Sequence, residues 1–320
     1  MNRTQKVNRA VVLVAGLASA GFAQAEEGGS GHYMPGSMAS FIDSVPTAPT
    51  FITRLNVINY EGSVSPRIAL PFGGMLATGI DASITGVGVS MVWRPDWTIA
   101  EGWSYAMSST IPLIKSDVSA SATIPAERGV DLSDTETGLG DIIIQPIMLS
   151  HTVNPDFKFN TRVTVYTPTG NYTAGKLANT GKNFWTLSPS AEFMYMGQKN
   201  GIEASLFAGV DFNTENNDTD YRSGTQFHLD GTLAQHFPLW GGLAGAGISG
   251  FYYQQISADS GSGAKFGDFE AKTVGIGPAL SYGTKVGEHS VTGELKWLHE
   301  IDAENRLKGD TIFFKLLGTF

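Results

Sequence analysis

The 320-residue sequence contains no cysteine. A disulfide framework and thiolate metal sites are therefore excluded. The sequence also lacks a long hydrophobic run: the apolar stretch 10–20 is shorter than the roughly 20 residues that a membrane-spanning helix needs, and no later stretch is as long. If the chain lies in a membrane, it must cross as a closed β-barrel, because only helices and closed barrels satisfy every backbone polar group in lipid.

Basic residues are also few. The sequence has 21 Lys and Arg residues against 30 Asp and Glu residues, which is a net charge of −9. An acidic balance of this size disfavours nucleic acid as a partner. It suits a surface that faces the outside of a Gram-negative cell.

Sequence signatures of catalysis and metal binding are missing as well. There is no H-E-x-x-H and no G-x-S-x-G motif. Residues 245–250 fit G-x-G-x-x-G, but they lie within a strand pattern instead of opening a helix. We therefore expect no catalytic residue, no metal, no cofactor and no enzyme. A barrel-embedded hydrolase with an unrecognised site and a structural or adhesin-like barrel are the alternatives.

The first residues have the pattern of an export signal. Arg3, Lys6 and Arg9 precede the apolar stretch 10–20, and an A-x-A cleavage site ends at Ala25. The pattern predicts a signal peptide over 1–25, cleaved after Ala25, and export toward the bacterial outer membrane.

Segments in which apolar and polar residues alternate recur between turn residues, without helical periodicity. They predict an all-β fold: a transmembrane antiparallel β-barrel of about twelve strands over residues 51–320. The chain ends on Phe320, which is typical of the closing strand of outer-membrane barrels, and we expect Phe320 to be the signal for the barrel-assembly machinery. The predicted strands are 51–64, 80–94, 103–123, 139–151, 156–168, 186–196, 202–212, 226–237, 243–256, 270–283, 289–301 and 310–320.

The predicted connections alternate between long and short. Outer-membrane barrels have long loops outside and short turns in the periplasm, so the alternation predicts this orientation and places both termini in the periplasm. The long connections are 124–138, 169–185, 213–225, 257–269 and 302–309, and the short ones are 152–155, 197–201, 238–242 and 284–288.

Charged side chains fall on one face of each of four clearly patterned strands. In 202–212, for example, Glu203 and Asp211 alternate with Leu206 and Val210. A charge facing lipid near the midplane costs about 2–4 kcal/mol, so we expect the charged faces to line a wet lumen. A soluble barrel or sandwich with the faces reversed is the alternative. The predicted lining of the solute path is Lys158, Arg162, Glu192, Glu203, Asp211, His228, Asp230, His236, Glu294 and Lys296.

The segment 26–50 is rich in Gly, Pro and Ser and shows no clear period. It is predicted to be an irregular segment, either a periplasmic tail or a plug folded into the lumen. Phe41 and Ile42 give it apolar surface to bury, which favours the plug. A twelve-stranded barrel is narrower than the porins and needs its lumen filled, so we expect a gated path in place of an open aqueous pore.

The connection 213–225 is acidic and is predicted to lie outside the cell. Its oxygen ligands could hold Ca²⁺ or bridge the cations of lipopolysaccharide, but it lacks the spacing of an EF-hand, and a solvated loop is the simpler interpretation. Tyr221 and Arg222 could pair with its carboxylates and fold the loop inward. The residues assigned to this outside loop are Asp218, Asp220, Tyr221 and Arg222. Outer-membrane lipid and lipopolysaccharide are the expected surroundings.

Several stretches resemble a known family. They are HYMPG (32–36), GLGDIIIQP (138–146), YTPTGNY (166–172) and LANTGKNFWT (177–186). Together they are similar to the outer-membrane family labelled "phenol degradation protein meta", of the MetA pathway of phenol degradation, whose members are also described as transporters. The resemblance implies a barrel that admits small hydrophobic or aromatic molecules during aromatic degradation. It brings no established catalytic residues to carry over.

Overall fold

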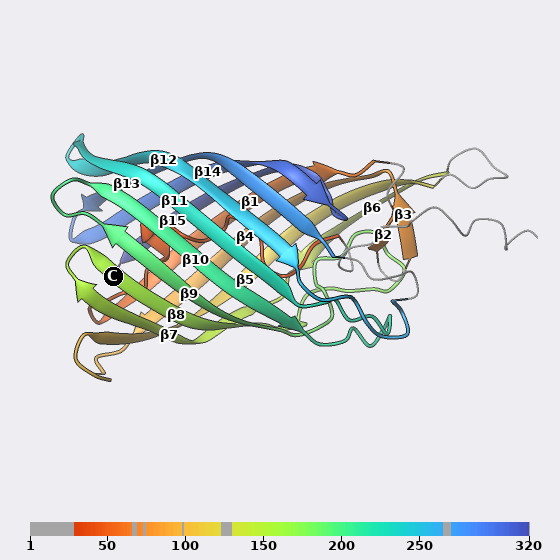
Figure 1. Ribbon diagram of the computed structural model, residues 1–320, viewed down its shortest axis with the longest axis horizontal. Coiled ribbons are helices and arrows are strands. Elements are labelled where there is room, and N and C mark those ends of the chain that lie inside the picture. Colours follow the sequence, from red (N-terminus) through yellow and green to blue (C-terminus); the bar gives the residue numbers. More distant parts are fainter. Residues whose placement is uncertain are drawn as a thin grey trace, which may run out of the picture.

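The computed structural model describes residues 29–65, 69–72, 75–97, 99–122, 130–264 and 270–319. Twelve long strands form a closed antiparallel barrel (Figure 1). They are β1 (Thr50–Ser63), β4 (Ile80–Arg94), β5 (Trp103–Ala122), β7 (Ile143–Asn154), β8 (Phe157–Tyr166), β9 (Thr186–Met196), β10 (Ile202–Asn213), β11 (Gln226–Leu239), β12 (Gly242–Gln255), β13 (Lys272–Val286), β14 (His289–Glu304) and β15 (Lys308–Thr319). The predicted fold is confirmed.

The ring closes through its first and last strands. β1 pairs with β15 along its length, from Ile52 opposite Thr319 to Ser63 opposite Lys308. On its other side β1 pairs with β4, which pairs with β5, and each remaining strand pairs with its neighbours along the chain. Each of the twelve long strands in this ring pairs on both sides. A sheet that spans a bilayer needs this closure, because lipid offers no hydrogen-bond partner to an unpaired strand edge.

The two faces of the barrel wall differ as the alternation predicts. Large apolar side chains such as Leu206, Leu233, Ile248 and Leu280 are exposed on the outer face, whereas Glu203, Asp211 and Asp230 are buried inside. Apolar side chains outside and ionised ones inside are the pattern of a transmembrane barrel. The alternative of a soluble barrel with reversed faces is therefore wrong. Among the described residues, no helix is long and apolar enough to cross a membrane.

The two ends of the barrel differ in their connections. Short turns at 155–156, 197–201, 240–241 and 287–288 lie at one end, which we call the turn end, at the left of Figure 1. The described parts of the connections 64–79, 167–185, 214–225 and 256–271 lie at the opposite end, which we call the loop end. The connection 64–79 includes a small hairpin of β2 (Ala69–Phe72) and β3 (Met75–Thr78).

Two predicted loops are shorter than expected. Residues 130–138, placed in the predicted loop 124–138, belong to β6 (Val130–Leu139), which pairs with the outer half of β5. The predicted strand 139–151 therefore divides at 140–142, where the chain leaves the ladder and Asp141 accepts hydrogen bonds from the 167–185 loop. The predicted connection 302–309 is a tight turn at 305–307, because β14 and β15 extend further than their apolar pattern indicated.

Residues 29–49 lie inside the barrel, and we call them the lumen segment. The segment passes from contacts with Lys182 near the loop end to contacts with Lys315 further toward the turn end, and then enters β1. A short 3₁₀ turn, η1 (Phe41–Asp43), lies along it. The predicted signal peptide and Phe320 lie outside the described residues.

Candidate solute path through the barrel

A cavity of about 320 Å³ lies between the lumen segment and the barrel wall. Side chains of β1, β4, β5, β7 and β8 form its wall side. Its apolar lining includes Met34, Met38, Ile58, Ile84, Ile114 and Phe207, and its polar lining includes Asn56, Ser90, Thr110, Gln145 and Thr164. A mostly apolar cavity of this volume, with a few polar groups, is the size that small organic ligands fill. We call it the main cavity.

A smaller cavity of about 70 Å³ adjoins it toward the loop end. Tyr172, Leu177 and Leu307, which lie on or beside loop-end connections, line it. Met34, Ile84 and Lys182 line both cavities. The two spaces therefore lie next to each other along the lumen segment, the smaller one nearer the loops.

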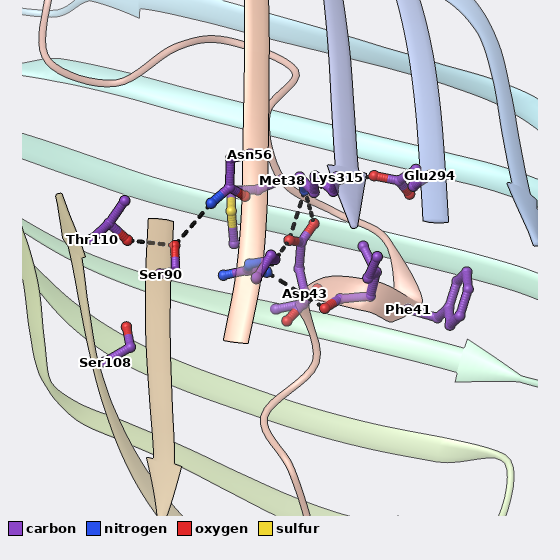
Figure 2. Close-up of polar contacts among 12 residues, drawn as sticks. Met38, Phe41, Asp43, Asn56, Ser90, Ser108, Thr110, Glu294 and Lys315 are labelled. Carbon is purple, nitrogen blue, oxygen red and sulfur yellow. Dashed lines mark hydrogen bonds and ion pairs between the residues drawn. The ribbon is translucent and has the colours of Figure 1, made fainter. Parts of the chain in front are cut away.

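The main cavity ends at a charged floor. The Lys315 amine donates to both carboxylate oxygens of Asp43 at 2.7 Å, and Arg54 Nη1 donates to Oδ1 at 2.9 Å. The Asp43 side chain has no exposed area. Figure 2 shows Asp43 and Lys315 in this network, with Asn56, Ser90 and Thr110 linked beside it by hydrogen bonds.

Two more buried cations hold the backbone of the lumen segment. Lys296 Nζ donates to the Met38 carbonyl at 2.7 Å, and Arg162 Nη2 donates to the Asp43 carbonyl at 3.1 Å. Arg162 also pairs with Glu192 at 2.8 Å. Cations of the wall therefore bind both the side chain and the backbone of the segment, and charge-assisted hydrogen bonds of this kind are the stronger ones in proteins.

A tight turn at Met34–Ser37 fits the segment against the wall. Ser37 N donates to the Met34 carbonyl, and Gly36 has a φ of +86° after Pro35, the sequence pattern of a type II turn. A Cβ at Gly36 would lie 2.1 Å from Leu298 Cδ1, so only glycine fits. Glycine at this position therefore satisfies both the backbone conformation and the close approach.

Asp230 of β11 binds this turn from the other side. Its carboxylate accepts hydrogen bonds from Gly36 N at 3.0 Å, from Met38 N at 2.9 Å and from the Tyr33 hydroxyl at 2.5 Å. Glu203 of β10 accepts from Phe41 N at 2.8 Å. These contacts satisfy the polar backbone of an irregular segment that has no ladder of its own.

The turn-end side of the charged floor is closed by apolar packing. Val45, Ile52, Val92, Ala106 and Met148 form a buried cluster there. The lumen segment supplies Val45, and the strands supply the other side chains. The charged floor and this apolar cluster thus separate the main cavity from the turn end.

His32 forms a polar relay near the loop end. Its Nε2 lies 3.0 Å from Asp141 Oδ2 and its Nδ1 lies 2.7 Å from Thr186 Oγ1. Thr186 is buried, and its hydroxyl donates to Asn213. This order resembles a hydroxyl–histidine–acid arrangement. In an activated nucleophile the hydroxyl would donate to the histidine, whereas the Thr186 hydroxyl donates to the Asn213 amide oxygen. The described residues hold no group of three or more His, Asp and Glu side chains able to bind a metal ion.

The comparisons with known proteins agree with this architecture. A family model described as "Putative MetA-pathway of phenol degradation" matches residues 62–316. The chain belongs to this family. The family resemblance that the motifs predicted is thereby confirmed. A search of the curated proteins found no match.

The solved structures similar to this chain include an outer-membrane channel and a domain of an autotransporter. The COG4313 outer membrane channel from Pseudomonas putida F1 is 13% identical, with a TM-score of 0.63 over 90% of this chain and 100% of that one. The beta domain of the Bordetella autotransporter BrkA is 12% identical, with a TM-score of 0.49 over 85% of this chain and 100% of that one. At these identities the first structure shows the fold alone.

The predicted lining residues all fall on the inner face of the MetA-family barrel. All of them except Lys158 are buried, and Lys158 is half-buried on the inner face of β8. They do not form one site. Arg162 and Glu192 lie with Glu294 and Lys296 around η1, whereas Asp230 and the pair Asp211–His228 hold Tyr33, whose ring stacks on that of His228 at 3.6 Å.

The predicted outside-loop residues lie in the 214–225 connection, with partners that the sequence did not indicate. The Tyr221 hydroxyl donates to Asp259 of the neighbouring loop, and Arg222 Nε donates to the Asn213 carbonyl. Asp220 accepts from Ser262, also in the neighbouring loop. These contacts join the loop sideways to 256–264. The pairing of Tyr221 and Arg222 with the loop's own carboxylates stays a prediction.

Several important residues were not predicted. Asp43 could not be found, because the aperiodic lumen segment gives no sign of which side chain meets the wall. Arg54 and Lys315 could have been found, since each is a charged residue on the polar face of a patterned strand. His32 and Asp141 lie in the family motifs, but nothing in the motifs indicates that they contact each other.

Proposed function

We propose that this protein is a channel of the bacterial outer membrane that admits small hydrophobic or aromatic molecules, with no catalytic activity. The observation that supports this most directly is the pair of adjoining cavities along the lumen segment, the smaller one nearer the loops. The description of the family, which refers to phenol degradation, agrees with solutes of this class.

The proposed orientation puts the loop end outside the cell and the turn end in the periplasm. A solute would enter between the 167–185 loop and the 305–307 turn, which line the smaller cavity through Leu177 and Leu307. Apolar side chains then favour a poorly soluble molecule over a sugar, because a sugar would lose hydrogen bonds to water without finding enough replacements. Acidic side chains at the loop end would face lipopolysaccharide and its divalent cations, and the closing strand would be recognised by the assembly machinery.

The proposed gate is the lumen segment. Its contacts with Lys296, Lys315 and Asp230 are hydrogen bonds and ion pairs, so they can be exchanged for water without breaking a covalent bond. Passage to the turn end requires η1 and Val45 to leave the floor and the apolar cluster beneath it. Entry and release would therefore be separate steps, with the main cavity as the position between them.

Uptake into proteoliposomes tests the proposal. Vesicles that contain the refolded protein should accumulate toluene or phenol faster than protein-free vesicles, with glucose uptake unchanged. An Ile84→Trp variant should slow aromatic uptake, because Ile84 lines both cavities and a larger ring would fill their junction. Leu233→Trp is the matched control, since Leu233 is exposed on the outer face. Equal aromatic uptake by vesicles with and without protein would refute the proposal.

A further inference from the structure

We propose that Asp43 occupies a binding site for the carboxylate of the transported solute, so that the preferred solutes are small aromatic or aliphatic acids. This inference rests on the proposed function and narrows its substrate class. Asp43 then acts as an internal competitor, which holds the lumen segment in place until the carboxylate of a solute replaces its own.

The site is built by the barrel wall and not by the segment that fills it. Arg54 is in β1 and Lys315 is in β15, and the two strands are paired, with Lys315 directly opposite Asn56. The backbone that carries both cations therefore belongs to the wall and does not depend on the lumen segment. Lys315 Nζ lies 2.7 Å from each Asp43 oxygen, and Arg54 approaches Oδ1, which is the geometry of carboxylate recognition.

At the charged floor, the cations of the wall outnumber its carboxylates, so an anion that is not part of the wall is favoured there. Its wall cations are Arg54, Arg162, Lys296 and Lys315, and its wall carboxylates are Glu192 and Glu294. Asp43 supplies a third negative charge against these four cations. If the segment left and nothing replaced it, buried cations would lose their counter-charge, which is strongly unfavourable. An incoming carboxylate would remove that penalty, and a neutral solute would not.

The main cavity leads directly to this site. Asp43, Arg54 and Lys315 line it together with the apolar side chains of Ile58, Ile84 and other residues. A molecule with an apolar body and one carboxylate matches this arrangement: its body fits the apolar part and its acid group meets the floor. Arg54 also has a spare donor, because its buried Nε has no hydrogen-bond partner among the described residues.

An alternative role for Asp43 is simple anchoring. In that case its removal would open the lumen equally to charged and neutral molecules of the same shape. Benzoate and benzyl alcohol make this comparison, since they share a ring and differ in charge. The two roles therefore predict different ratios of benzoate affinity to benzyl alcohol affinity once Asp43 is removed.

The test is equilibrium binding of benzoate and of benzyl alcohol to the full-length purified protein in detergent. We expect Asp43→Asn to bind benzoate at least about tenfold more tightly than the wild type, equivalent to about 1.4 kcal/mol, and to bind benzyl alcohol with little change. Adding Lys315→Gln to Asp43→Asn should remove that gain. Asp96→Asn, which removes the same charge from an exposed turn, should change neither affinity.

Equal gains for benzoate and benzyl alcohol, or a benzoate gain that survives Lys315→Gln, would overturn the inference. Heat-shifted gel mobility shows whether each variant is folded. If Asp43→Asn does not fold, the single variant Lys315→Gln decides the question. The inference then requires that this variant bind benzoate more weakly than the wild type and bind benzyl alcohol equally well. Any other result contradicts the inference. Toluene uptake by proteoliposomes with the wild-type protein tests the proposed function separately. If toluene is taken up but benzoate does not bind selectively, the channel function stands and only the carboxylate site is contradicted.

Discussion

At the scale of the residue, the lumen segment depends on single positions that tolerate no larger side chain. Gly36 is the clearest, because its positive φ and its contact with Leu298 both exclude a Cβ. Asp230 depends on the same turn, since it accepts hydrogen bonds from the backbone at Gly36 and Met38. A change at Gly36 should therefore detach the turn from the wall without altering any charge.

Gly36→Ala should loosen the lumen segment by more than about 1 kcal/mol, the usual cost of an L-residue in the left-handed region. A Ser40→Cys reporter, in a chain that otherwise lacks cysteine, measures this. Ser40 is fully buried, so maleimide should label the reporter slowly in the parent and markedly faster with Gly36→Ala. Gly175→Ala is the matched control, because Gly175 has a φ of +87° but nothing within 4 Å of its Cβ position. Equal labelling rates in all three proteins would contradict the role assigned to Gly36.

Alternation along strands predicted which wall residues face inward but not what they contact. Glu203 and Asp230 were assigned to the lumen because they share a strand face with other polar residues. Their actual partners, Phe41 and Tyr33, come from an aperiodic segment more than 150 residues away in sequence. Period-two patterning describes one strand at a time, so it contains no information about such long-range contacts.

At the scale of the element, the break between β6 and β7 was the main feature that the sequence concealed. Residues 130–139 contain Asp131, Asp134 and Glu136, and their polarity made them look like a loop. They form a strand because β5 continues beyond the apolar band and offers them a ladder to pair with. Near water a strand needs no apolar face, so hydrophobic alternation underestimates its length.

The 167–185 loop is held at this break by Asp141. The Asp141 carboxylate accepts from Gly170 N at 2.8 Å and Lys182 N at 2.7 Å. The loop also closes on itself, since a Cβ at Gly170 would lie 2.6 Å from the Gly181 Cα. One buried carboxylate thus fixes the loop at both ends of its turn and contacts His32 of the lumen segment as well.

Asp141→Ala should release this loop, because two part-buried N–H groups would lose their acceptor, at up to about 1 kcal/mol each. Limited trypsin digestion of the protein in detergent should then cut after Lys176 or Lys182 several times faster than in the wild type. Asp310→Ala, at a half-exposed position on the outer face, is the control and should leave the rate unchanged. Unaltered digestion of the Asp141→Ala protein would show that the loop is held by other contacts.

At the scale of the whole molecule, the lumen segment determines whether a barrel of this size conducts. The wall alone encloses a lumen lined by ionised groups, which water and ions would fill. The segment replaces that water with η1, with the turn at Met34–Ser37 and with the apolar cluster around Val45. Binding of an irregular segment by many polar contacts gives a closed state that can be reversed.

Deletion of residues 28–49 should therefore raise the single-channel conductance in planar bilayers several-fold. The open lumen should also prefer anions, since the wall cations Arg54 and Lys315 would lose Asp43 as their counter-charge. A reversal potential measured across a KCl gradient reports this preference, and high salt should weaken it through screening. Trp240→Ala, in an exposed turn at the turn end, is the control and should conduct like the wild type. Conductance unchanged by the deletion would mean that the segment does not close the path. A rise in conductance with a preference for cations would mean that the carboxylates Glu192 and Glu294 dominate the charge of the open floor, and not the Arg and Lys side chains of the wall.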